Sequence, residues 1–110
     1  MKCLDKRVDE IIAKYYPNNQ NKLNELEPVN LENERMLGSY LIGLKPEYNN
    51  LSDHNAFREV INVLDGTVEN YFEFINCYEV NFKNDRLDMK NLNKLISIKY
   101  IEPNGIVRMI

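Results

Sequence analysis

The sequence has no tryptophan, one histidine and two cysteines. Cys3 and Cys77 lie far apart in the chain, which predicts neither a disulfide framework nor a cysteine-based metal motif, and both are expected to be ordinary thiols in a reducing compartment. No apolar run approaches the roughly 20 residues of a membrane span. Acidic residues interrupt the amino terminus, so no secretion signal is predicted. We therefore expect a cytoplasmic protein without a membrane partner.

The chain has 110 residues, of which 44% are hydrophobic and 28% are charged. This composition is too apolar for an intrinsically disordered protein. A second hydrophobic core would need roughly 50 more residues, so residues 1–110 are predicted to form a single domain. The formal charge is -3, whereas proteins that bind nucleic acids usually carry a basic surface. Nucleic acid is therefore not expected as a partner.

The amino-terminal half is predicted to be mainly helical. Apolar residues recur at spacings of three and four over residues 4–16, which indicates an amphipathic helix that Pro17 ends. Residues 17–21 are polar and aperiodic, as expected of a loop. Leu23 and Leu26 fit one short helical turn.

A second helix is predicted to begin at Asn30, which can cap it, with Glu32 and Glu34 suiting the positive end of its dipole. Its buried stripe would consist of Leu37, Tyr40, Leu41 and Leu44. Gly38 and Gly43 weaken a helix by up to about 1 kcal/mol each, so the end of this element is alternatively a strand.

The clearest helical pattern lies between Ser52, the expected amino-terminal cap, and Gly66. Its predicted core-facing residues are Phe57, Val60, Ile61 and Leu64. Apolar residues then fall on even positions, an alternation typical of a strand; these are Phe72, Phe74, Tyr78, Val80 and Phe82. Residues 67–76 fit either a strand or a helix, and the strand is clear only from Tyr78.

Residues 83–85 are predicted to form a turn. Residues 95–102 and 106–110 resemble two strands of a hairpin that turns at Asn104 and Gly105, because such turns favour residues that tolerate a positive φ. The predicted fold is α+β, with amino-terminal helices packed on a small carboxy-terminal antiparallel β-sheet.

No catalytic motif survives inspection. His54 is the only histidine and is interpreted as a surface residue in the first turn of its helix; Ser52 is better explained as a cap, and Ser39 is not in a Gly-x-Ser-x-Gly elbow. The stretch 38–45 has two glycines and a lysine, but the lysine stands one residue too late for a phosphate-binding loop.

A metal or cofactor site is not predicted either. One histidine and two distant cysteines cannot make a zinc site, and Asp85 and Asp88 do not have the spacing of a calcium loop. We therefore expect no cofactor and no enzymatic activity.

Two features indicate a surface for another protein. Four acidic residues fall within ten positions: Glu25, Glu27, Glu32 and Glu34. Such a cluster is usually a solvated face, but it would also attract a basic partner. Tyr48 lies in a predicted loop without a buried stripe, and tyrosine is common in interfaces.

The sequence therefore predicts a non-enzymatic protein-binding module, such as an immunity protein or another stoichiometric inhibitor that neutralises a basic toxin or nuclease. The alternative is a small structural or regulatory subunit that forms a homodimer through its first helix or its last strand. A third possibility is an unrecognised enzyme that uses Asp53 or His54 as acid or base.

Overall fold

The computed structural model describes residues 4–27, 29, 38–83 and 87–104. In chain order the elements are α1 (Leu4–Tyr15), η1 (Pro17–Asn19), β1 (Ser39–Leu44), α2 (Leu51–Val63), β2 (Gly66–Phe72), η2 (Glu73–Ile75), β3 (Cys77–Phe82), α3 (Met89–Leu92) and β4 (Ile98–Pro103), η1 and η2 being single 3-10 turns. The helix predicted over residues 4–16 is confirmed, and it ends before Pro17 because proline cannot continue the backbone hydrogen bonds.

The four strands form one antiparallel sheet in the order β2-β3-β1-β4. Because β1 and β2 both run antiparallel to β3, they are parallel to each other with β3 between them, and α2 makes the crossover. From β1 onward this is the split β-α-β-β-α-β arrangement, with α3 as a second, very short helix. The predicted α+β class with an antiparallel sheet is confirmed, although β1 precedes α2 in the chain.

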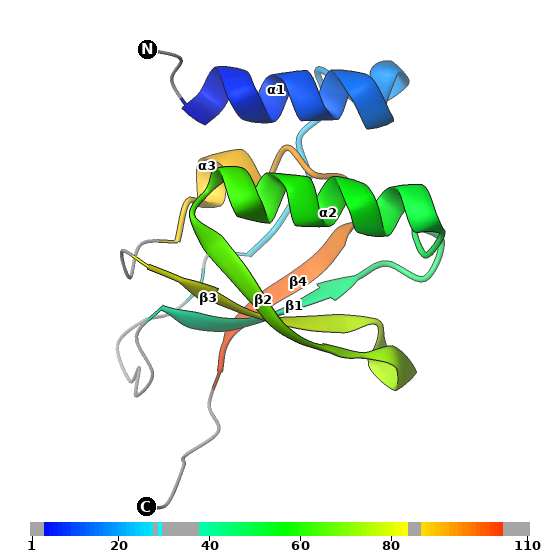
Figure 1. Cartoon of the computed structure of the whole chain (residues 1–110). Coiled ribbons are helices and arrows are strands. Elements are labelled where there is room, and N and C mark those ends of the chain that lie inside the picture. The colour runs from blue at the N-terminus through cyan, green and yellow to red at the C-terminus, as the bar shows by residue number, and fades with distance from the viewer. Residues whose placement is uncertain (1–3, 28, 30–37, 84–86, 105–110) are drawn as a thin grey trace, which may run out of the picture.

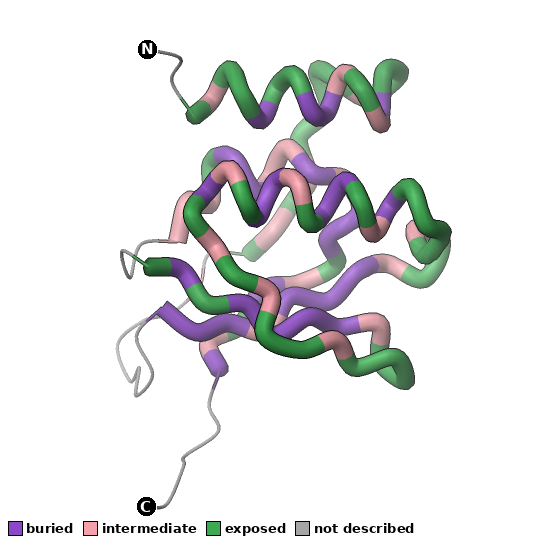
Figure 2. The backbone as a smooth tube through the Cα atoms, in the orientation of Figure 1, coloured by how far each residue is buried: buried purple, intermediate pink, exposed green. Residues whose placement is uncertain are grey.

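The elements stack in three layers, with α2 and α3 on one face of the sheet and α1 on the far side of α2 (Figure 1). Val8, Ile11 and Ile12 of α1 are buried, and Figure 2 shows the buried part of α1 on the side toward α2. The core extends from there through α2 to alternate residues of the strands, which include Tyr40, Ile42, Leu44, Tyr78, Val80 and Phe82.

Helix α2 matches its prediction closely, since Phe57, Val60, Ile61 and Leu64 are all buried. The cap is Asn50 rather than Ser52. The Asn50 side chain accepts the backbone N–H of Asp53, and the Asp53 carboxylate accepts the backbone N–H of Asn50. Such a cap stabilises a helix by about 1 kcal/mol. Ser52 only donates its hydroxyl to the Asn50 side chain.

The end of the predicted second helix is a strand, Ser39–Leu44, as the alternative based on Gly38 and Gly43 allowed. Pairing with β3 and β4 on both sides overrides the helical spacing. Gly43 belongs in this strand because the ring of Tyr100 lies across it: a Cβ there would stand 2.2 Å from a ring carbon. Residues 30–37, which would begin the helix, lie outside the described residues.

Residues 67–76 divide between strand β2 and the 3-10 turn η2. The even-numbered alternation is therefore confirmed only in β3. The left-handed backbone of Asn76 (φ 48°) and the η2 turn interrupt it, and this leaves Phe72 and Phe74 exposed.

The other predictions concern the segment around Leu23 and Leu26 and the chain from residue 83 onward. The helical turn at Leu23 and Leu26 is wrong, because the chain there is non-helical and tied to the end of α3 by hydrogen bonds from Asn24 and Leu26 to Asn93. The first hairpin strand is shorter than expected, since β4 begins at Ile98. Part of the predicted turn, 84–85, and the rest of the hairpin, 105–110, lie outside the described residues.

Candidate functional site

A hollow of about 370 Å³ opens between the outer side of α2 and the strands β2 and β3 at one edge of the sheet. It is lined by Leu51, His54, Asn55 and Arg58 of α2, Tyr71 of β2 and Tyr78 of β3. The helical repeat places the four α2 residues on one side of the helix, at the end where the Asn50 cap fixes its start. Edge strand β2 and its neighbour β3 supply the opposite wall.

His54 is held on both ring nitrogens. Its Nε2 lies 2.8 Å from the Asn49 Oδ1, and its Nδ1 lies within hydrogen-bond distance of the Tyr78 hydroxyl. Because an amide oxygen can only accept, Nε2 carries the proton and Tyr78 donates to Nδ1. Burial and, to a smaller extent, the charge of Arg58 lower the pKa of His54 below its ordinary value. The neutral imidazole is therefore a structural link between α2 and the sheet.

The tyrosines form an aromatic wall whose hydroxyl groups are already bonded. Tyr78 stacks on Phe57 with a centroid distance of 4.3 Å, and burial raises the pKa of its hydroxyl. Tyr71 packs against Tyr78 and donates its hydroxyl to the Asn76 side chain at 2.7 Å. Arg58 lies over the Tyr78 ring, 5.6 Å from its centroid. These contacts hold the tyrosine rings together as a mostly aromatic surface.

Exposed apolar side chains gather at this end of the molecule. Within the described residues, four of the six large apolar side chains that are most exposed belong to the start of α2 or to the β2–η2 segment; these are Leu51, Phe72, Phe74 and Ile75. Leu51 is 76% exposed, Ile75 is 61% exposed and Phe74 is fully exposed. Figure 1 shows the start of α2 and η2 at the same end of the fold.

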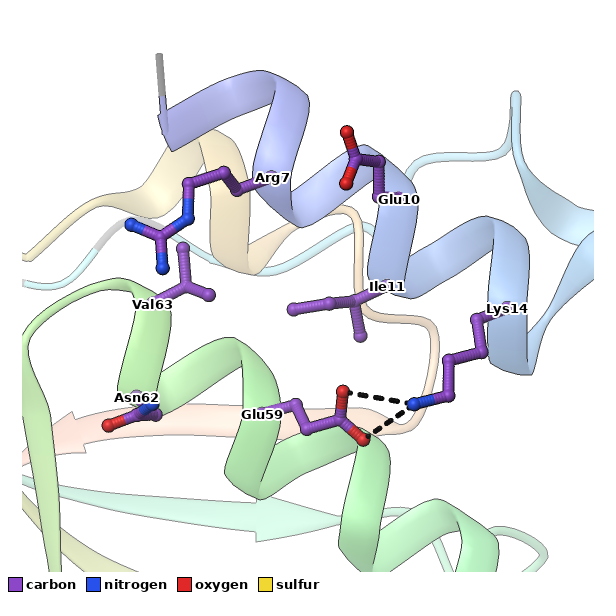
Figure 3. A pocket seen from close by; sticks show the side chains of 7 residues that line it. All are labelled: Arg7, Glu10, Ile11, Lys14, Glu59, Asn62 and Val63. Carbon is purple, nitrogen blue, oxygen red and sulfur yellow. Dashed lines mark hydrogen bonds and ion pairs between the residues drawn. The ribbon is translucent and has the colours of Figure 1, made fainter. Parts of the chain in front are cut away.

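A second hollow, of about 360 Å³, lies between α1 and α2 (Figure 3). An ion pair at 3.3 Å between Lys14 and Glu59 crosses one end of it, and Tyr15 also donates to Glu59. The Glu59 carboxylate raises the pKa of Lys14. Since its charges serve to join the two helices, this hollow contributes to packing rather than to chemistry.

The predicted site residues occupy a different region. Glu25 and Glu27 are exposed, whereas Glu32 and Glu34 lie outside the described residues. Tyr48 is half-buried rather than free, with its ring edge-on to that of Tyr16 at 6.1 Å. Lys45 links the segment of Asn24 to Tyr48, because its Nζ lies 3.3 Å from the Asn24 Oδ1 and 6.0 Å from the centroid of the Tyr48 ring.

The residues considered for catalysis have structural partners. Asp53 is buried, and besides its role in the cap it accepts a hydrogen bond of 2.6 Å from the Tyr16 hydroxyl. The hydroxyl of Ser39 accepts from Asn104, and Ser52 donates to Asn50, so neither serine is bonded to His54. Among the described residues no cluster of three or more His, Cys, Asp or Glu side chains could hold a metal ion.

The Cys77 thiol is fully buried, and burial raises its pKa, so it is a poor nucleophile. In the part of the chain that the structure describes, no helix is both long and apolar enough to cross a membrane.

The lowered pKa of His54 predicts that acid weakens the fold. The unfolded chain binds the proton more readily, so stability falls as the pH drops below about 6.5 toward the lower pKa of the folded state. The free energy of unfolding, measured by urea denaturation between about pH 7.5 and 5.5, should decrease in the native protein. His54→Gln should make the free energy of unfolding less dependent on pH. An equal pH dependence in both proteins would contradict the role of a neutral His54 as the link between α2 and the sheet.

We compared the chain with protein-family models, with curated proteins and with solved structures, and none of them matches it.

Proposed function

We propose that this chain is a non-enzymatic protein-binding module whose main contact surface is the end formed by the start of α2, the end of β2 and η2. We call this surface the η2 end and define it by Leu51, Arg58, Tyr71, Phe74 and Ile75.

The fully exposed ring of Phe74 carries the proposal. Large apolar side chains that gather on a surface beside aromatic residues and an arginine are the composition of a binding hot spot. Phe74 and Ile75 lie in η2, the single 3-10 turn that follows directly on β2, so their backbone is already ordered before a partner covers it.

The biological form that we propose is a cytoplasmic stoichiometric inhibitor of the immunity type, whose partner is a basic toxin or nuclease. The net charge of -3 and the exposed Glu25 and Glu27 support a basic partner, because opposite charges accelerate association. In this arrangement the acidic cluster steers the partner and the η2 end holds it.

Steering predicts a salt-sensitive association rate. Replacing Glu25, Glu27, Glu32 and Glu34 together by glutamine should slow association with the partner, and raising the ionic strength should slow the native protein in the same way, since the Debye length falls from about 10 Å at 0.1 M to about 3 Å at 1 M. Surface plasmon resonance across a salt series measures both effects. A rate that changes with neither salt nor substitution would remove the steering role.

Affinity capture from the source cell, followed by identification of the retained protein and calorimetric titration, tests the proposal as a whole. We expect one partner that binds at a one-to-one ratio. A protein that retains no specific partner and instead turns over a small molecule would contradict it.

A homodimeric subunit is the second candidate, and the two edge strands of the described sheet, β4 and β2, favour it. Within the described sheet β2 has a neighbour on one side only, and such an edge can pair with another strand. The register shift between Val68 and Asn70 disrupts that edge, which argues against self-pairing. Sedimentation velocity distinguishes the two candidates, because the inhibitor is expected to be a monomer before it meets its partner.

A further inference from the structure

We infer that the hollow between α2 and the edge strands receives a carboxylate group of the partner protein, presented next to an apolar side chain. This inference rests on the proposed function and specifies the chemistry of its contact surface. It is argued from the polar groups of the hollow that can still form a hydrogen bond with a ligand.

Most polar atoms that line the hollow are already used. His54 is bonded through both ring nitrogens, and the hydroxyl of Tyr78 is directed at His54. The hydroxyl of Tyr71 is directed at Asn76. The groups left with capacity are Arg58, whose guanidinium lies over the Tyr78 ring, and the exposed Asn55. Arg58 can only donate and the Asn55 amide can also donate, so both can bind a hydrogen-bond acceptor in the hollow.

The positive charge of Arg58 indicates that the hydrogen-bond acceptor is an anion. Arg58 is the cationic side chain that lines the hollow, and no described carboxylate forms an ion pair with it. A guanidinium group binds a carboxylate through two parallel hydrogen bonds. Asn55 and Arg58 are three residues apart on α2 and so lie on the same side of the helix.

A monoanion fits better than a phosphate dianion. Only one arginine lines the hollow, and Glu73 and Asp53 lie close enough to influence its titrating groups. These carboxylates partly offset the positive field, and a second negative charge on the ligand would be repelled. The chain as a whole is acidic, which adds to that repulsion.

The apolar walls of the hollow favour a ligand in which an apolar group stands next to the carboxylate. Leu51 and the rings of Tyr71 and Tyr78 form an apolar lining. Phe74 and Ile75 extend the apolar surface beyond Tyr71 along the chain. A globally basic partner still carries individual carboxylates, so this local contact is compatible with charge steering.

The test uses a matched pair of small probes on the full chain. We expect 3-phenylpropionate to cause saturable chemical-shift changes at His54, Arg58 and Tyr71 in NMR titrations, and 3-phenylpropionamide, which differs only in its charge, to bind at least about tenfold more weakly. Arg58→Gln should weaken binding of the carboxylate by a similar factor. Arg58→Lys should restore part of it, because a lysine keeps the charge without the planar fork.

Each contrary outcome overturns the inference. Equal binding of acid and amide, unchanged binding by Arg58→Gln, or no saturable shift with either probe would show that the hollow does not read a carboxylate. Tighter binding of phenyl phosphate would assign it to phosphate instead. None of these results depends on the partner, so the proposed function would still stand or fall by affinity capture.

Discussion

Replacing Ile61 by alanine is expected to lower the free energy of unfolding by about 2 to 5 kcal/mol. Ile61 is 1% exposed and lies in the middle of the buried stripe of α2. It packs so closely on the start of β2 that a Cβ on Gly66 would stand 2.6 Å from its Cγ2. Truncation leaves a cavity where α2 meets the sheet, and the fixed crossover prevents the two from closing it.

Urea denaturation of the native protein and the variant measures this loss. Asn62→Ala is the matched control, because Asn62 is exposed on the same helix and its replacement should change stability by less than about 0.5 kcal/mol. A cost below about 0.5 kcal/mol for Ile61→Ala would mean that the stripe does not face the core.

Replacing Phe74 by aspartate is expected to weaken binding of the partner by about 30-fold or more, the effect of losing a hot-spot residue worth about 2 kcal/mol. Because Phe74 is fully exposed, the folded chain itself should keep its stability. The variant therefore separates a contact with the partner from a contribution to the fold.

Leu4→Asp supplies the control for that substitution. Leu4 is also a large exposed apolar side chain, 40% exposed, but it begins α1 at the opposite end of the fold from η2 (Figure 1). An aspartate there should leave the affinity unchanged. Equal losses for the two variants would mean that hydrophobicity or net charge matters, and not the η2 end.

Helix α2 and strand β3 could be predicted from the sequence because their periodicity and their burial agree. In α2 a polar cap and a helical stripe coincide, although the left-handed residue after the helix is Asp65 and the expected terminal Gly66 begins β2; in β3 the alternating residues face the core. Strand β1 was harder because Tyr40, Leu41 and Leu44 also satisfy a helical spacing. Its pairing with β3 and β4, both distant in sequence, decides the matter.

The candidate site could not be predicted for a related reason. His54 and Arg58 are ordinary polar residues of a helix until β2 and β3 bring Tyr71 and Tyr78 beside them. The sequence did show Phe72 and Phe74 in a strand-like alternation, and this suggested buried residues. The 3-10 turn η2 and the positive φ of Asn76 interrupt the strand, so that these two side chains are exposed. Asn is one of the few residues that accept a positive φ.

The dissociation constant of the captured partner, measured by calorimetry for the native chain, for Phe74→Asp and for the variant with glutamine at all four positions of the acidic cluster, tests the central proposal most directly. Binding through the η2 end predicts a loss of about 30-fold or more for Phe74→Asp and a smaller loss for the glutamine variant. Native affinity in Phe74→Asp, together with a collapse of binding in the glutamine variant, would contradict it and place the contact surface on the acidic segment.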